Sequence, residues 1–193
     1  IGEIVRQFGE RGGKKFRQAL FYSAYASYNK SRTDEILNFS IIFELIHSFA
    51  LIHDDIIDHS FLRRGYPTLH EEYDIETAIL FGDFALILAD DLFTKNILQL
   101  SSSEEIRKKS IACYSLLKQE VLIGEYLDYV KHSDTDTIML LKTARYSFSR
   151  PVELGLILAG AETPVIQKWL DIATKIGVLF QLKDDYIGTF GTV

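Results

Sequence analysis

The sequence predicts an all-α protein, a bundle of long, mostly antiparallel helices joined by short connections. Three observations support this fold class. Apolar residues recur at helical spacing in several long stretches, no stretch keeps the alternation of a half-buried strand, and the glycines fall at the joints between helical stretches. The 193 residues are 47% hydrophobic and 25% charged, which suits a substantial core. We therefore expect a single domain over residues 1–193 in the helical-bundle class.

The expected helices cover residues 16–28, 36–59, 75–98, 105–129, 136–158 and 164–186. Thr33-Asp34-Glu35 is a helix start signal before the second of them. Ser101 with Glu104 has the spacing of a capping box before the fourth. Pro151 is expected to kink or split the fifth. Residues 65–68 are expected to form a turn.

The run from Glu44 to Gly65 reads ELIHSFALIHDDIIDHSFLRRG and suggests a metal site. On a helix Asp54 and Asp58 share one face, and Asp55 is rotated from Asp54 by about 100°. Three acids this close repel one another unless a cation neutralises them. Hard oxygen ligands in this number suit Mg²⁺, which leaves its other positions to water and phosphate oxygens. Arg63 and Arg64 follow, and guanidinium groups match phosphate geometry. The run predicts a metal–diphosphate site at the end of a buried helix.

A second carboxylate pair, Asp184 and Asp185, ends another apolar stretch. Two such pairs can face each other across a cavity, because helical bundles build metal sites from inward acids. Lys142 and Thr143 offer a cation and a hydroxyl on a third helix. Asp90-Asp91 lacks a third acid and nearby arginines, so we interpret it as a solvated or capping pair.

Positive side chains also gather at the start of the first expected helix, where Lys14, Lys15 and Arg17 follow two glycines. They oppose the helix dipole unless an anion is bound there, and the alternative interpretation is a solvated basic turn.

Composition narrows the partners and the compartment. The net charge of −6 argues against nucleic acid as the main partner. Cys113 is the single cysteine, so no internal disulfide is expected and a reducing, cytoplasmic compartment is favoured. No signal peptide is visible at the start. The longest apolar run, Ile36 to Ile52, is interrupted by polar residues, so we expect a core helix and no membrane span.

Several segments together carry a resemblance: GGKKFR (12–17), ELIHSFALIHDDIID (44–58), RRGYPTLH (63–70), GD (82–83), GEYLD (124–128), KTA (142–144) and FQLKDD (180–185). In this order and at nearly this spacing they resemble the trans-isoprenyl diphosphate synthases of the polyprenyl synthetase family, most nearly its short-chain geranylgeranyl and farnesyl diphosphate synthases. The resemblance implies the isoprenoid synthase fold, with helices around a central prenyl cavity. It also implies a Mg²⁺-dependent prenyltransferase that joins isopentenyl diphosphate to an allylic diphosphate (dimethylallyl, geranyl or farnesyl), working as a homodimer.

The resemblance assigns a role to each matching residue. Asp54, Asp58 and Asp184 are implied to hold three Mg²⁺ ions that bridge the allylic diphosphate, supported by Asp55 and Asp185. Arg63 and Lys142 are implied to grip that same diphosphate. Isopentenyl diphosphate is implied to contact Lys14, Arg17, His47 and Arg64. Thr143 and Gln181 are implied to lie along the allylic chain, where their oxygen dipoles stabilise a carbocation.

Product length is implied to depend on the fifth and fourth residues before Asp54, Phe49 and Ala50, which line the cavity floor in the family. One large and one small side chain suggest a cavity of middle depth and favour the twenty-carbon product, geranylgeranyl diphosphate. The alternative is that Phe49 is ordinary core and that neighbours such as Tyr22 or Leu80 set the depth.

The chain departs from the family pattern in several places. Gly188 stands where the second acidic motif usually has a third aspartate, Glu125 where glutamine is usual, and Gln18 where proline is usual. The segment between Asp128 and Lys142 is short for the family. The family usually continues beyond Val193, so we expect that loops and a C-terminal helical part are missing from these residues.

Three other functions remain open from the sequence. A non-catalytic or regulatory subunit of a heteromeric prenyl synthase would keep the fold without the chemistry. A class I terpene cyclase shares an aspartate-rich helix but has no second diphosphate to bind, which GGKKFR and RRG argue against. A metal phosphohydrolase using His53-Asp54 would need further histidine ligands at separate positions, which the spacing of the other histidines (His47, His59, His70 and His132) argues against.

Overall fold

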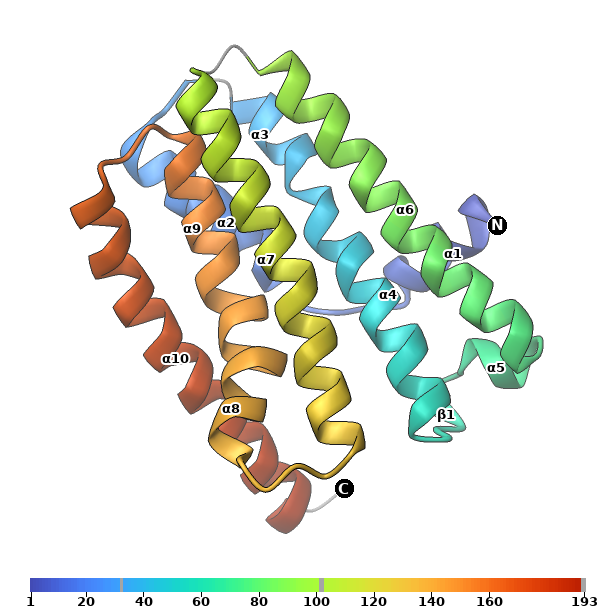
Figure 1. Ribbon diagram of the computed structural model, residues 1–193. Helices are drawn as coiled ribbons and strands as arrows, with labels where there is room; N and C mark the ends of the chain where they lie inside the picture. The colour runs from blue at the N-terminus through green and yellow to red at the C-terminus, as the bar shows by residue number, and fades with distance from the viewer. Residues whose placement is uncertain (32, 101–102, 192–193) are drawn as a thin grey trace. The chain divides into compact units, whose positions relative to one another are not determined.

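The computed structural model describes residues 1–31, 33–100 and 103–191. The chain divides into two compact units, Ile1–Gln18 with Asp34–Ser101, and Ala19–Thr33 with Ser102–Val193. Nearly all of the regular structure is helical, with one hairpin of two short strands, so the expected all-α class is confirmed (Figure 1). The expectation of a single domain with a central prenyl cavity stays a prediction.

The first unit contains α1 (Gly2–Glu10), α3 (Thr33–Phe39), α4 (Ile41–Ile57), β1 (Leu62–Arg63), β2 (Tyr66–Pro67), α5 (Leu69–Glu72) and α6 (Ile75–Gln99). The long helices α4 and α6 lie side by side (Figure 1). Phe43 and Ile46 of α4 are fully buried, and the rings of Phe39 and Phe93 meet edge to face at 5.5 Å. The core of this unit therefore lies along α4, the helix that carries the first aspartates.

The expected helix over residues 36–59 is divided at Ser40. Its hydroxyl donates to the carbonyl oxygen of Leu37 at 2.6 Å, a local bond that competes with regular helical geometry. The stretch Asp34–Ile57 meets the length and composition of a membrane span. Its most apolar 18-residue window has a mean hydropathy of 1.6, and 56% of that window is buried. A core helix passes the same test, and α4 buries its apolar face inside the first unit.

The second unit contains α7 (Glu104–Tyr129), α8 (Thr135–Met139), the π-helix η1 (Leu140–Ser149), α9 (Arg150–Leu158) and α10 (Thr163–Phe190), together with most of α2 (Phe16–Tyr28). The N-cap of α7 is Ser103, which accepts from the N–H of Ile106 at 3.2 Å. Ser101, the expected capping residue, lies outside the described residues.

The expected helix over residues 136–158 is divided beside Pro151, where the π-helix η1 ends and α9 begins with the proline in its first turn. Proline has no N–H, so the regular bond to the carbonyl four residues earlier cannot form. The N–H of Arg150 reaches instead to the carbonyl of Arg145, five residues back. The ten residues of this π-helix carry Lys142 and Thr143.

Glycines let the neighbouring helices approach this π-helix closely. A Cβ added to Gly124 of α7 would lie 2.5 Å from the backbone nitrogen of Lys142. One added to Gly177 of α10 would lie 2.6 Å from the Cα of Ala144. Two glycines on different helices therefore hold the backbone on either side of Thr143.

Candidate active site

The first aspartates lie where α4 ends. The N–H of Asp58 donates to the carbonyl of Asp54 at 2.8 Å, so the two residues are one helical turn apart, as expected. His59 then adopts a left-handed conformation with φ 52°, and the N–H of Ser60 returns to the carbonyl of Asp55 at 2.9 Å. This pattern is a Schellman-type helix end, and it turns the chain back toward the aspartates.

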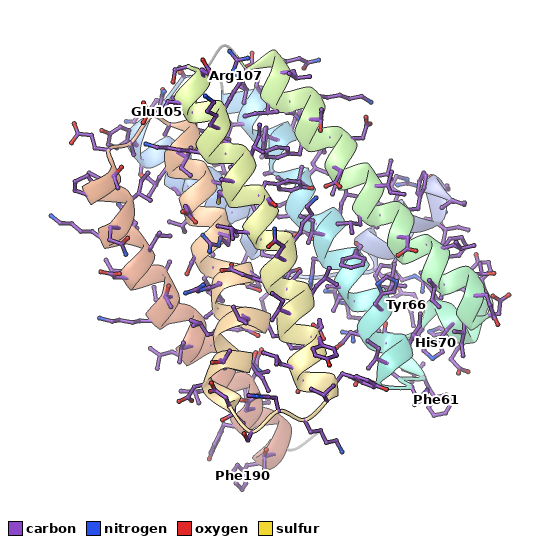
Figure 2. All side chains as sticks on the ribbon, in the orientation of Figure 1. Phe61, Tyr66, His70, Glu105, Arg107 and Phe190 are labelled. Atoms are coloured by element: carbon purple, nitrogen blue, oxygen red, sulfur yellow. The ribbon has the colours of Figure 1, made fainter. Side chains whose placement is uncertain are left out.

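A hairpin then presents the two arginines in different directions. The turn expected over residues 65–68 is wrong by two positions, because the turn of the hairpin covers residues 63–66. Arg64 and Gly65, with φ 55° and 81°, form a two-residue turn, and Tyr66 and Pro67 belong to β2. Two positive φ values match the twist of a tight hairpin. Phe61 projects outward beside this hairpin and is 71% exposed (Figure 2).

Arg63 binds both neighbouring aspartates. Its Nε donates to Oδ1 of Asp55 at 2.6 Å, and its Nη2 to Oδ2 of Asp54 at 3.2 Å. The side chain of Asp55 is 1% exposed, and its Oδ2 has no hydrogen-bond partner among the described residues. Burial raises the pKa of Asp55, against the lowering effect of Arg63, and the charge of Asp54 raises it further.

This cluster fits a magnesium ion in its chemistry. Among the described residues, no group of three or more His, Cys, Asp or Glu side chains is arranged to hold a metal. Mg²⁺ usually takes only one or two carboxylates and completes its shell with water and substrate phosphates. Asp54 and the exposed Asp58 supply such oxygens, while the buried Asp55 has an acceptor atom without a partner. The donor set therefore suits Mg²⁺ held together with a phosphate ligand.

A separate basic cluster lies about two helical turns earlier on α4. The Nη1 of Arg64 donates to the carbonyl of Gly12, and the guanidinium packs against Gly13. The pKa of His47 is held well below its ordinary value, first by burial and then by the positive charges of Arg17, Arg64 and Arg63. His47 is therefore a neutral imidazole beside two arginines. Lys14, the remaining expected member, is exposed.

Sequence reasoning gave Glu44 no role in this basic cluster. Its Oε1 is buried without a hydrogen-bond partner in the described part of the chain. Burial raises its pKa, and the charges of Arg17, Lys15 and Arg64 oppose that shift. Glu44 precedes His47 by three residues, so helical spacing alone was the signal that places both on one side of α4.

The second unit holds the other expected site residues. Lys142 Nζ lies 2.7 Å from Oδ2 of Asp128 and 2.9 Å from Oε2 of Glu125. The hydroxyl of Thr143 donates to Oε1 of Gln181. The Nε2 of Gln181 in turn donates to Oδ1 of Asp185 at 2.7 Å. Thr143, Gln181 and Asp185 thus form one hydrogen-bonded chain from η1 to α10.

We expected the second aspartate pair at a helix end, and this prediction is wrong. Helix α10 continues through Asp184 and Asp185 to Phe190. Gly188 lies inside the helix. Glycine has a lower helix propensity than other residues except proline, but nothing prevents it from adopting helical backbone angles. Both aspartates are exposed on the surface of the second unit. That they face the first aspartates across a cavity stays a prediction.

The positions expected to set product length are both buried. Phe49 is 5% and Ala50 7% exposed. The ring of Phe49 meets that of His53 edge to face at 4.7 Å. Gly82 of α6 makes room for His53, since an added Cβ would lie 2.9 Å from its Nε2, and Asp83 Oδ1 lies 3.5 Å from the same atom. The Gly82-Asp83 motif therefore supports the ring that backs Phe49.

The helical architecture is the isoprenoid synthase fold. A geranylgeranyl pyrophosphate synthase from Corynebacterium glutamicum, crystallised with isoprenyl diphosphate and magnesium, matches with a TM-score of 0.84 and 32% identity, over 97% of this chain and 59% of that one. A geranyltransferase from Helicobacter pylori matches with a TM-score of 0.84 and 26% identity, over 95% of this chain and 67% of that one.

The chain belongs to the polyprenyl synthetase family, whose sequence pattern matches residues 1–193. Geranylgeranyl diphosphate synthase of Sulfolobus acidocaldarius is 29% identical over 181 residues, which is 92% of this chain and 54% of the relative. Farnesyl diphosphate synthase of Bacillus subtilis is 30% identical over 192 residues, 95% of this chain and 64% of the relative. The chain therefore spans little more than half the length of the curated relatives it matches.

Proposed function

We propose that the protein is a Mg²⁺-dependent prenyltransferase that condenses isopentenyl diphosphate with an allylic diphosphate and releases diphosphate. The observation that carries the proposal is the pair of clusters on α4. Carboxylates with Arg63 stand at the helix end, and His47 with two arginines stands seven residues earlier, roughly 10 Å along the axis. One helix thus offers a metal-type site and a direct cationic site, as two diphosphates require.

The residues take the roles that the family resemblance implies. Lys14, Arg17, His47 and Arg64 bind the diphosphate of isopentenyl diphosphate. Arg63 and Lys142 bind the allylic diphosphate, with Asp54, Asp58 and Asp184 as metal ligands and Asp55 and Asp185 behind them. When bound, Mg²⁺ (three ions by resemblance) stabilises the negative charge that develops on the departing diphosphate. The buried Asp55 orients Arg63 toward Asp54.

The bond changes balance without a side-chain base. The allylic C–O bond breaks and its electron pair leaves with the diphosphate. The double bond of isopentenyl diphosphate then forms the new C–C bond to the allylic carbocation, and the released diphosphate accepts the proton that is lost. Thr143 and Gln181 supply oxygen dipoles, and their mutual hydrogen bond fixes their orientation. Positioning of the two substrates supplies the remaining rate enhancement.

We propose geranylgeranyl diphosphate as the product, because the family resemblance links one large and one small side chain at these two positions to a cavity of middle depth, and both Phe49 and Ala50 are buried. Relatives named geranylgeranyl diphosphate synthase support this choice. We further propose a cytoplasmic homodimer. The buried thiol of Cys113, whose pKa burial raises well above its ordinary value, suits a reducing compartment.

The test is an assay of the full-length protein with isopentenyl diphosphate, each allylic diphosphate and Mg²⁺, followed by product identification. We expect a twenty-carbon product, its loss in Asp54→Ala, and longer products from Phe49→Ala, which removes the ring at the floor. Equal amounts of product from wild type and Asp54→Ala contradict the proposed prenyltransferase activity. An unchanged product length in an active, folded Phe49→Ala contradicts the role of Phe49.

The second candidate is a non-catalytic subunit of a heteromeric synthase. One relative, 26% identical over 199 residues, is named heptaprenyl diphosphate synthase component 2, a name that describes one part of a larger enzyme. This candidate predicts no product from the protein alone and product only after a partner chain is added. The same assay separates the two.

A further inference from the structure

Lys142 in the second unit shares its charge with two carboxylates of α7. Its Nζ lies 2.7 Å from Asp128 and 2.9 Å from Glu125, which are charge-assisted hydrogen-bond distances. The side chains are 27%, 51% and 19% exposed for Lys142, Asp128 and Glu125. Glu125 is thus the more sheltered of the two partners, and water screens its contact with the ammonium less.

The backbone brings these groups together. Gly124 allows α7 to approach η1 so closely that any side chain there would meet the backbone nitrogen of Lys142 at 2.5 Å. The next residue is Glu125, and Asp128 follows three residues later on the same face. The lysine side chain therefore leaves η1 directly beside both acids. This contact is built into the packing of the two helices.

The charges of Lys142, Asp128 and Glu125 disfavour the binding of a diphosphate that carries no metal ion. One ammonium and two carboxylates sum to −1, so an approaching diphosphate meets net repulsion at the lysine expected to bind it. A divalent cation travelling with the diphosphate removes that repulsion. With a neutral group in place of Glu125, the sum is zero and Lys142 keeps one partner, Asp128.

We propose that Glu125 is a positioning residue that neutralises Lys142 and thereby makes diphosphate binding at this lysine depend on a divalent cation. The inference rests on the proposed function, in which Lys142 contacts the allylic diphosphate. It assigns to Glu125 a role in excluding metal-free diphosphate. The chemical class that it selects is a diphosphate already complexed with a divalent metal.

The experiment is calorimetric titration of the full-length protein with inorganic diphosphate, in chelator and in saturating Mg²⁺. We expect Glu125→Gln to strengthen metal-free binding by about five- to tenfold, because the ammonium of Lys142 is then released from one of its two carboxylates and can turn to the diphosphate. In Mg²⁺ we expect a change below about twofold. The ratio of the two affinities, which a purely structural role would not move, is the readout.

The matched control is Glu105→Gln. It makes the same charge change on α7, where Glu105 is exposed and paired with Lys109, at the far end of the helix (Figure 2). Twenty residues of helix separate it from Glu125, about 30 Å. We expect this variant to bind like wild type under both conditions. Asp128→Asn makes a second, independent test of the same group if Glu125→Gln does not fold.

A cycle with Lys142→Ala tests whether Glu125 acts through the lysine. In that background we expect Glu125→Gln to change metal-free affinity by less than about twofold. An equal gain with and without Lys142, or a gain matched by Glu105→Gln, overturns the inference. Wild type that binds no diphosphate even in Mg²⁺ overturns the proposed function as well. Wild type that binds while Glu125→Gln is unchanged overturns the inference alone.

Discussion

His47 is a partly buried histidine beside positive charges, and this makes the stability of the fold depend on pH. Its pKa lies well below the ordinary 6.5 in the folded protein, because burial and Arg17, Arg64 and Arg63 disfavour the imidazolium. The unfolded chain therefore binds a proton below pH 6.5 that the folded chain does not. More protons on the unfolded state mean that stability rises with pH across this range and falls as the pH is lowered.

We expect the free energy of unfolding to fall below pH 6.5 by at most about 1.4 kcal/mol per pH unit from this residue. Urea unfolding at a series of pH values measures it, and His47→Gln is the comparison because it has no titrating group. The difference between the two proteins isolates His47 from the other titrating side chains. Parallel curves for the two proteins from pH 7 to 5 contradict the assignment of a neutral His47.

Arg64 and the glycine turn give a second prediction at this scale. Gly12 and Gly13 have φ of 115° and 122°, where any other residue is strained. A Cβ on Gly13 would also lie 3.1 Å from the guanidinium of Arg64, whereas one on Gly12 meets Arg64 only at an ordinary 3.8 Å. The two glycines thus share the strain, and the carbonyl of Gly12 accepts a hydrogen bond from Arg64, but only a Cβ at Gly13 would crowd the guanidinium.

We expect both Gly12→Ala and Gly13→Ala to lower stability by about 1–3 kcal/mol, from backbone strain. Only Gly13→Ala is expected to raise the KM for isopentenyl diphosphate as well, by roughly tenfold, because it moves one charged contact worth about 1.5 kcal/mol. Steady-state kinetics beside thermal unfolding separates the effects. Equal KM values in the two variants would falsify the positioning of Arg64 by Gly13.

At the scale of elements, α10 contains two glycines in opposite situations. Gly177 is buried against Ala144 of the π-helix, and a Cβ added to it would lie 2.6 Å from the Cα of Ala144. A Cβ added to Gly188 would meet no atom within 4 Å. Gly177→Ala is expected to lower the free energy of unfolding by about 1–3 kcal/mol through overpacking. Gly188→Ala is expected to gain about 0.5–1 kcal/mol through helix propensity. Denaturant unfolding of both variants checks the pair, and a loss in both contradicts this packing.

The sequence predicts the long helices well and their interruptions poorly. The expected bounds of α6 and α7 differ from the structure by about one residue at an end, because long apolar periodicity is a strong local signal. The π-helix before Pro151 depends on which carbonyl the N–H of Arg150 reaches, and that is a packing outcome. Helices α1 and α5 were not predicted, since short helices owe their stability to the unit they pack on.

In the candidate site, too, local patterns were predicted from the sequence and contacts between distant residues were not. Residue type and spacing pick out Asp54, Asp58 and Arg63, since carboxylates one turn apart followed by arginines are a local pattern. The partners are not local. Nothing in the spacing shows that Glu125 reaches across to Lys142, or that Glu44 has a buried carboxylate oxygen near the arginines, because those contacts depend on which helices pack together.

At the scale of the whole molecule, exposed apolar side chains on α6 point to further association. Leu80 and Ile87 are 62% and 61% exposed and seven residues apart, so they share one face of the helix. Large exposed apolar faces of this kind mark contact surfaces. The proposed homodimer gives this face a partner, since a two-fold interface places the same patch on both chains.

We therefore expect Leu80→Asp with Ile87→Asp to convert a dimer into a monomer, because each charge would be buried without a partner in the interface. Both side chains are exposed within the chain, so its own fold should tolerate the change. Sedimentation equilibrium gives the mass. Leu179→Asp, at a 65% exposed position on α10, is the control and should remain dimeric. A dimer that survives the double substitution places the interface elsewhere, and a monomeric wild type removes the homodimer from the proposal.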